Sequence, residues 1–515
     1  MVKELKHIPL VCTTAIAVTI SFYGTIPFSF SFCRASRALL FILCLIAFLQ
    51  NCILFSSSKN ENASLLLTGI CLLSGLGIGL ICAWTVTRTR APVTTLATRE
   101  KITSVQVTLL SDPCPAGDRW YRAEGYVSAC EYPDTVLFSA DGKCLVYIPA
   151  TIVREALPGG IGTGSNSRVL FSKGLTISFH GHFGRYNSET GDSFYVTNSV
   201  GMPTWSSHLC FIRAKLRLAL MRVLYGYGDA GGLILALLSA NRSWLSPTLA
   251  EDFRNAGLSY ILALSGMHLA VLGLLAKTIG RKIAGLKGAL FLFILVIVFF
   301  VWFAGASPSL IRAFIMALIL IGAGQRGFGN RIFSILALTF LIHIIFIPTD
   351  AVSVGFILSY SALLGILSLG KAFSRMVEPF VPPYLRDVLS ASAGAQLATA
   401  PFVAVTFGCI TPIALLSSCI VAFPVSVFLV CGLLLTICMG VFPATSNVCG
   451  IFLNVLYQGV AIPVRFFSRV PPLPIEGMPA KIFFVLISFV ACLTCIYFSA
   501  IALKRRSADD NFAQL

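Results

Sequence analysis

The chain has 515 residues, of which 57% are hydrophobic and only 11% are charged. Soluble globular domains carry about a quarter charged residues, so the composition excludes a soluble protein and indicates a polytopic α-helical membrane protein. The formal net charge of +17 is typical of a membrane protein with basic cytoplasmic loops, and it also suits a polyanionic substrate.

Three apolar runs open the chain, near residues 9–28, 38–55 and 65–84. Each approaches the roughly 20 residues that cross a bilayer as a helix. The first run follows Lys3 and Lys6 and has no convincing cleavage site, so we interpret it as a retained helix rather than a signal peptide. Residues 1–87 are therefore predicted to hold three transmembrane helices.

Residues 88–207 are more polar and alternate in short runs such as YRAEGYVSACEY and LTISFHGHFGRY. Gly, Pro, Asn and Asp separate the runs, a pattern that predicts a small β-domain of barrel type. Residues 101–200 hold eight Lys/Arg and nine Asp/Glu, so no basic patch for nucleic acid is evident. Two of Cys114, Cys130 and Cys144 could pair if this domain faces an oxidising compartment.

A basic amphipathic segment follows at 208–227, within a connector that covers 208–257. Its four cations alternate with apolar residues, which predicts a helix that lies at the membrane interface and contacts anionic lipid. The cations are Arg213, Lys215, Arg217 and Arg222.

The remainder, 258–506, is predicted to be a polytopic helical domain with a short tail at 507–515. Its apolar runs lie at 258–279, 288–305, 309–323, 331–347, 352–370, 390–408, 412–440 and 480–503. The run 412–440 is too long for one ordinary crossing and is predicted to break near Pro424. Residues 450–470 are a further candidate.

Positive charge orients these runs. Alternate loops hold Lys or Arg, whereas the connections 305–308 and 348–351 between them hold neither. Basic loops face the cytoplasm, so residue 258 and the β-domain are expected on the external side. The basic loop residues are Arg281, Lys282, Lys287, Arg326, Arg331, Lys371, Arg375 and Arg386.

Polar residues interrupt two of the runs. Ser265 and His268 are three residues apart and share one helix face, with the bare backbone of Gly266 beside them. Such a group fits either close helix packing or a water-lined cavity with a broken helix. Arg312 lies a few residues into another run, where it is either functional or extended to the lipid headgroups.

Four blocks with polar residues follow one another in the helical domain. ALSGMHLAVLG contains Ser-Gly-x-His, and GASPSLIRAFIMA contains Ser-x-x-Arg-Ala-x-x-Met. DAVSVGFILSYSALLGIL runs from Asp350 through Ser359, and AQLATAPFVAVTFG contains Gln396 and Pro401. In this order the four blocks resemble the ComEC family of competence DNA-internalisation membrane channels, and the β-domain is similar to the external oligonucleotide-binding-type domain of that family.

The resemblance implies transport of single-stranded DNA across the bacterial cytoplasmic (inner) membrane during natural transformation, through residues 258–506. The implied partners are single-stranded DNA, membrane lipid, a DNA receptor, a separate nuclease and a cytoplasmic helicase or motor. The residues that we expect to line the path are Ser265, Gly266, His268, Ser309, Arg312 and Gln396. The chain departs from the family pattern at Tyr260, Ile357 and Ala240, where His, Gln and Gly are common in the family.

Enzymatic chemistry is not expected. Longer members of the family end in a metallo-β-lactamase-like domain, which we do not find here, so this chain resembles the form without it. His180 and His182 lack the Asp and His that would complete a metal motif, and no phosphate-binding GxxxxGK[ST] occurs. We therefore predict no metal and no cofactor.

Two alternatives remain open from the sequence. A transporter for another anion would use the same polar residues. An intramembrane serine protease would use Ser265 as nucleophile and His343 as base, although the segment that begins at Ala263 lacks the Gly that leads the Gly-x-Ser-Gly motif of rhomboid proteases.

Overall fold

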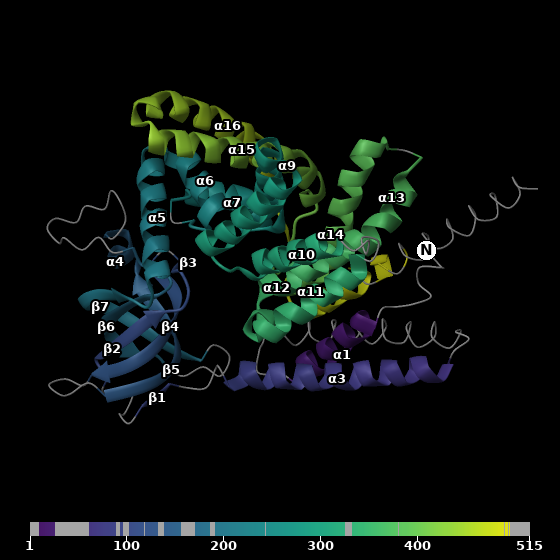
Figure 1. Cartoon of the computed structure of the whole chain (residues 1–515), viewed down its shortest axis with the longest axis horizontal. Helices are drawn as coiled ribbons and strands as arrows, with labels where there is room; N and C mark the ends of the chain where they lie inside the picture. The colour runs from purple at the N-terminus through teal and green to yellow at the C-terminus, as the bar shows by residue number, and fades with distance from the viewer. Residues whose placement is uncertain are drawn as a thin grey trace, which may run out of the picture.

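The structure is a computed structural model in which a sheet domain lies beside a larger group of helices (Figure 1). It describes residues 10–25, 61–88, 93–95, 102–155 apart from 118 and 132–137, 170–185, 191–242, 244–324, 332–379, 381–488, 490–492 and 494. The predicted run 38–55, the loop residues Arg326 and Arg331, and the tail at 507–515 lie outside the described residues.

The helices follow the predicted apolar runs closely. In chain order they are α1 Leu10–Thr25, α3 Glu61–Arg88, α4 Ala150–Glu155, α5 His208–Leu224, α6 Gly228–Ser239, α7 Pro247–Asn255, α8 Ser259–Leu262, α9 Gly266–Ala304, α10 Pro308–Gly324, α11 Ile332–Phe346, α12 Val354–Gly365, α13 Lys371–Val377, α14 Pro383–Phe407, α15 Ala414–Val441 and α16 Ser446–Ser468. The short helices are η2 Tyr225–Tyr227, η3 Pro348–Val352, the π-helical η4 Ile366–Gly370, and η5 Pro443–Thr445.

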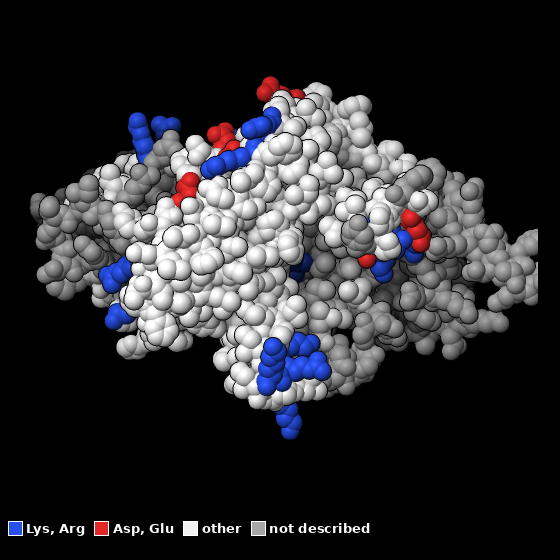
Figure 2. Space-filling model, turned by 90° about the horizontal axis from the view of Figure 1, so that it is seen from above, with Lys and Arg blue, Asp and Glu red and all other residues white. Residues whose placement is uncertain are grey.

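Five helical segments in the described part of the chain are long and apolar enough to cross a membrane. They are Gly266–Ala304, Val354–Val377, Leu385–Phe407, Ala414–Val441 and Pro443–Ser468. Figure 2 shows a face that is largely free of charge, with Lys and Arg in separate groups. Large apolar side chains such as Phe423 and Phe291 are 75% and 68% exposed, as lipid contact requires. The chain is an integral membrane protein.

Helix α9 is two antiparallel helices. Its backbone leaves the helical region at Ala284 and Gly285, and Gly285 has φ +64°. A β-carbon on Gly280 would lie 2.9 Å from the α-carbon of Ala289, so the chain folds back on itself at this point. The segments 266–283 and 286–304 are each roughly 27 Å long, and they match the two predicted runs 258–279 and 288–305.

Helix α15 corrects the prediction that 412–440 breaks near Pro424. It is a single helix with Pro424 inside, and its 28 residues are about 42 Å long. A bilayer offers no water to the backbone groups that a break would expose, so the helix continues through the proline. Helix α16, predicted as the candidate 450–470, runs beside α15 (Figure 1).

Helices α1 and α3 pack through small residues. Gly79 of α3 leaves no room for a β-carbon, because Ser21 Oγ of α1 occupies that space. Gly75 faces Ala17 of α1 in the same way, since a β-carbon on Gly75 would lie 2.7 Å from that of Ala17. Small residues four apart allow such close backbone approach between membrane helices. Tyr23 Oη then donates to the carbonyl of Ala351 at 2.6 Å and ties the pair to η3.

The sheet domain contains the strands β1 Thr94–Thr95, β2 Ser104–Leu109, β3 Cys114–Ala116, β4 Trp120–Glu131, β5 Phe138–Pro149, β6 Leu175–Phe183 and β7 Asp192–Trp205. Their order is β1-β5-β7-β6-β2-β4-β3, and β4 also pairs with β5. Five strands therefore have a neighbour on both sides. The β5–β7 pair is parallel and the other pairs are antiparallel. A separate pair, β8 Cys409–Ile410 and β9 Leu473–Pro474, lies outside this domain.

The possible disulfide among Cys114, Cys130 and Cys144 is not present in this structure. Cys114 and Cys144 are free thiols, and Cys144 is buried, which raises its pKa to about 12. Cys130 stands opposite Phe138 in the β4–β5 ladder, six residues from Cys144 on β5. At about 3.3 Å per residue this separation approaches roughly 20 Å, far beyond the α-carbon distance of a disulfide.

A strained backbone position gives the first testable prediction. Ala240, the C-cap of α6, has φ +57°, a left-handed conformation that costs an alanine about 1 kcal/mol or more. We expect Ala240→Gly to raise the free energy of unfolding by about 1 kcal/mol. Denaturant unfolding of the purified protein measures it. The control, Ala236→Gly inside the same helix, should instead destabilise by about 1 kcal/mol.

Candidate functional site: the α9–α10 junction and its link to the sheet domain

Arg213 and Arg217 of α5 point into the protein and share the carboxylate of Asp112, which lies between β2 and β3. Arg213 Nη2 is 2.7 Å from Asp112 Oδ2, and Arg217 Nη1 is 2.5 Å from the same oxygen. Arg213 Nε also donates to the carbonyl of Phe303 at 3.1 Å, and Arg217 Nη2 to that of Ser239 at 2.5 Å. This arrangement, the Asp112 clamp, joins the sheet domain to α5, α6 and α9.

The prediction that all four cations of this helix face lipid is therefore wrong for two of them. Arg213 and Arg217 are 5% and 4% exposed, because the half-buried carboxylate of Asp112 and backbone carbonyls satisfy them. Lys215 and Arg222 are exposed as predicted, and Lys215 Nζ lies 4.5 Å from the ring centre of Phe211. The lipid contact stays a prediction for these two side chains alone.

Ser265 and His268 form the start of α9. The backbone N–H of Ser265 donates to His268 Nδ1 at 3.1 Å, and Ser265 Oγ lies 3.2 Å from the same nitrogen. Since Nδ1 accepts, the neutral ring carries its proton on Nε2. That N–H is buried and has no hydrogen-bond partner among the described residues. The helix therefore begins with a donor that no group in the described part of the chain satisfies.

The start of α10 lies against the start of α9. Ser309 Oγ donates to the carbonyl of Leu264 at 2.5 Å. A β-carbon on Gly266 would meet Ala313 at 3.1 Å and Arg312 Nη2 at 3.7 Å, so glycine permits this close approach. Arg312 Nε is buried without a partner. The structure thus brings together five of the six residues predicted to line a path, and we call this group the α9–α10 junction.

A polar network continues from Arg312 into α12 and α11. The guanidinium carbon of Arg312 lies 5.8 Å from the ring centre of Tyr360. Tyr360 Oη is 3.3 Å from His343 Nδ1, and His343 Nε2 is 3.1 Å from Asp350 Oδ2. Sequence reasoning missed Tyr360, because a tyrosine in an apolar run is usually a packing residue and its contact with Arg312 depends on how the helices pack.

These contacts contradict the serine-protease alternative. Both ring nitrogens of His343 are engaged, by Tyr360 and by Asp350, whereas Ser265 contacts His268. A general base must lie within hydrogen-bond reach of the nucleophile's proton. His343 does not hold that position.

Gln396 stands apart from the junction. It lies on α14, half-buried, and its Nε2 contacts Ser392 Oγ of the same helix at 3.3 Å. Helix α14 packs on α12, which carries Tyr360, so Gln396 belongs to the next layer of helices. Its role in a path stays a prediction.

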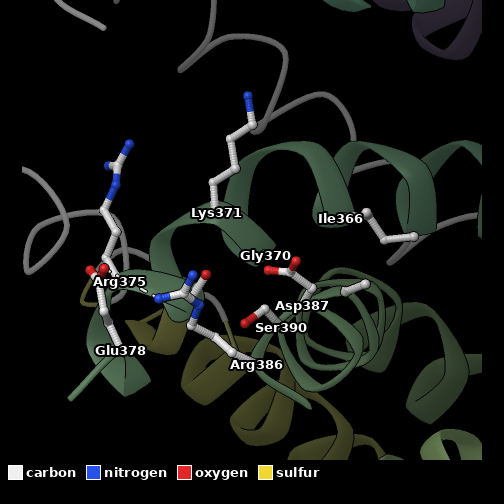
Figure 3. A pocket seen from close by; sticks show the side chains of 10 residues that line it. Ile366, Gly370, Lys371, Arg375, Glu378, Arg386, Asp387 and Ser390 are labelled. Carbon is white, nitrogen blue, oxygen red and sulfur yellow. Dashed lines mark ion pairs between the residues drawn. The ribbon is translucent and has the colours of Figure 1, made fainter. Parts of the chain in front are cut away.

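A pocket of about 390 Å³ opens where η4 and α13 meet the start of α14 (Figure 3). Lys371, Arg375 and Arg386 line it, three cations that the sequence assigns to cytoplasmic loops. Arg386 Nη1 pairs with Glu378 Oε1 at 3.2 Å. None of the six predicted path residues lines this pocket, so it is distinct from the α9–α10 junction.

Positive charge and unpaired donors lie together at the junction. Two helix N-termini meet there, and each carries about half a positive charge on its unpaired N–H groups. Arg312 adds a full charge, and two buried N–H groups lack an acceptor. Broken membrane helices bind anionic groups of substrates with such N-termini. The described residues contain no group of three or more side chains suited to a metal ion.

The Asp112 clamp gives the second prediction. Burial by itself raises the pKa of the Asp112 carboxyl, but Arg217 and Arg213 hold that pKa well below its usual range. Because the folded pKa is lowered, the stabilisation is complete above the pKa of an unfolded Asp, about 4, and is lost as pH falls further. We expect Asp112→Ala to cost about 3 kcal/mol of unfolding free energy at neutral pH, measured by denaturant titration.

The matched control is Glu251→Ala, which removes an exposed carboxylate paired with Arg254 at 3.2 Å. This change should cost less than about 0.5 kcal/mol. Equal effects of the two substitutions would mean that the clamp contributes no more than a surface ion pair.

Comparison with known proteins agrees with this architecture. ComE operon protein 3 of Bacillus subtilis (strain 168) is 24% identical over 150 residues, which are 29% of this chain and 19% of that protein. The match thus spans about a fifth of that relative's length. No solved structure matches the chain significantly. Residues 237–500, just over half of the chain, match the model of the competence protein family, and the chain belongs to that family.

Proposed function

We propose that this protein carries single-stranded DNA across the bacterial cytoplasmic membrane during natural transformation. The observation that carries the proposal is the α9–α10 junction, where two helix N-termini meet the Arg312 guanidinium, and where Arg312 Nε and His268 Nε2 are buried without a partner among the described residues. A DNA strand presents one phosphate charge per nucleotide, and phosphate oxygens are good acceptors for such donors. Membership of the competence protein family supports the same substrate.

His268 is fully buried and Ser265, Gly266, Ser309 and Arg312 are half-buried, so the junction is closed in this conformation. A strand would pass when the N-termini of α9 and α10 separate. Leaving two N–H groups unpaired costs about 1–3 kcal/mol each, which a phosphate oxygen would recover. The unpaired N–H groups of the closed junction therefore favour binding of an anion over tighter packing of the two helices.

The proposal includes the domain arrangement. Residues 1–87 would be an N-terminal membrane unit, 88–207 an external domain of oligonucleotide-binding type, 208–257 a connector and 258–506 the channel. Three features support that type of domain. The strands pair in the sequence β2, β4, β5, β7, β6 and back to β2, the β5–β7 pair is parallel, and helix α4 lies between β5 and β6 along the chain. The connections at 305–308 and 348–351, which hold no Lys or Arg, support an external location for the junction.

Substitution of Arg312 tests the function. Arg312→Ala removes the full charge at the junction, and we expect delivery of labelled DNA to the cytosol to fall about 10-fold or more at equal protein level. Such a decrease corresponds to losing about 1.4 kcal/mol of stabilisation for the strand in transit. Arg312→Lys should retain part of the delivery, because it keeps the charge and loses the forked donor.

The control is Arg254→Ala, which removes an arginine that is 69% exposed on α7 and causes the same change in net charge. It should leave delivery unchanged. Wild-type delivery by Arg312→Ala would contradict the role of the junction, and competition by small anions but not by DNA would instead favour an anion transporter.

A further inference from the structure

A row of side chains crosses four neighbouring strands of the sheet domain. Arg122 of β4 stands opposite Tyr147 of β5, Tyr147 is in register with Tyr195 of β7, and Tyr195 with His182 of β6. The ring centres of Tyr147 and Tyr195 are 4.9 Å apart with planes at 11°, and those of Tyr195 and His182 are 5.7 Å apart at 18°. The Trp120 ring meets Tyr195 edge-on at 5.8 Å. We call these five residues the ring row.

The ring row lies on the outer face of the sheet domain. Side chains alternate between faces along a strand, and the neighbours of the row, such as Val146, Ile148 and Phe194, are fully buried in the core. His182 and Arg122 are exposed, and the two tyrosines are half-buried. An outer row of aromatic rings therefore contributes nothing to the core of its own domain.

The backbone beneath the row is shaped to hold the rings. Gly184 follows β6 and lies against the Tyr195 ring. A β-carbon on Gly184 would lie 2.8 Å from a ring carbon of that tyrosine. Gly181 leaves no room for a β-carbon, because the carbonyl of Tyr195 occupies that space. Larger residues at either glycine would displace Tyr195, so the two positions fix the ring that joins the row together.

The row itself contains one cation, Arg122, which is exposed, and Glu124 lies next to it on the same face of β4. Two further exposed arginines follow or precede strands of the row in the sequence. Arg119 directly precedes Trp120, and Arg185 follows His182 by three residues. Rings flanked by arginines suit a ligand with flat groups and a negatively charged backbone.

We propose that the ring row is a base-stacking site for single-stranded DNA. Every nucleobase has a flat face that stacks on aromatic side chains, and the arginines would pair with the phosphates between the bases. The bases of a duplex already stack on each other, so the site would select unpaired strands. The inference builds on the proposed transport of single-stranded DNA, and it assigns initial capture of the strand to the sheet domain.

Binding of a fluorescein-labelled thymidine oligonucleotide of about 15 residues to the full-length protein in lipid nanodiscs tests the site. We expect Tyr195→Ala to weaken binding about 10-fold in fluorescence anisotropy, and His182→Ala, at the exposed end of the row, to weaken it severalfold. Tyr195→Phe should bind like the wild type, because the ring remains. Tyr126→Ala, at an exposed tyrosine of β4 outside the row, is the matched control and should have no effect.

An abasic oligonucleotide and a duplex of the same length identify the chemistry. Both should bind at least about 10-fold more weakly than the single strand at the same salt concentration, because neither offers free base faces. Equal binding of the abasic strand would overturn base stacking and leave phosphate attraction alone. Unchanged affinity of folded Tyr195→Ala and His182→Ala would overturn the site.

Delivery assays on the same variants separate this inference from the transport proposal. Arg312→Ala should lower delivery about 10-fold or more while leaving the ring row intact, whereas Tyr195→Ala should weaken oligonucleotide binding. If Arg312→Ala delivers normally while Tyr195→Ala loses binding, the transport role of the junction fails and the ring row stands. If Arg312→Ala blocks delivery while the row variants bind normally, the reverse holds.

Discussion

The ion pairs between Asp112 and the two arginines of α5 fix the relation between the two parts of this protein. Buried charges are tolerated only when their partners are in place, so Asp112, Arg213 and Arg217 determine one position of the sheet domain against the helices. Arg213 also contacts Phe303, at the end of α9 and just before α10 begins. The sheet domain is therefore held beside the same end of the bundle at which Ser309 and Arg312 lie.

Under the proposed function, this arrangement would divide recognition of a nucleic acid strand between two sites of different chemistry. The ring row offers flat faces to bases, whereas the α9–α10 junction offers N–H groups and a guanidinium to phosphates. Neither site reads a base sequence, because stacking and phosphate contacts are common to all nucleotides. A protein that transports strands of any sequence requires such contacts.

The sequence predicted local features well and long-range partners poorly. Apolar runs of helical length located α10 and α11, and the Ser265–His268 spacing correctly indicated a helix start with polar contacts. Arg213 and Arg217 were assigned to lipid because their partner, Asp112, is about 100 residues away in a different domain. Composition cannot distinguish a cation that faces lipid from one that faces a distant carboxylate.

The same limit applies to aromatic residues. Tyr147, Tyr195 and His182 lie in three separate runs, and only strand register brings them into one row. Tyr360 was likewise hidden, since its contact with Arg312 depends on how α12 packs on α10. Pro424 shows the opposite error, a predicted break that the structure does not contain. Proline often ends helices in water, but inside a membrane α15 continues through it.

The close packing of α12 on α14 restricts how the bundle can rearrange. A β-carbon on Gly365 would collide with the backbone of Gly394, and one on Gly394 would lie 2.6 Å from the nitrogen of Gly370. Backbones in such contact cannot slide past each other without a clash. These two helices must therefore move as a single rigid unit, so that any gate in this protein hinges at the connections around them.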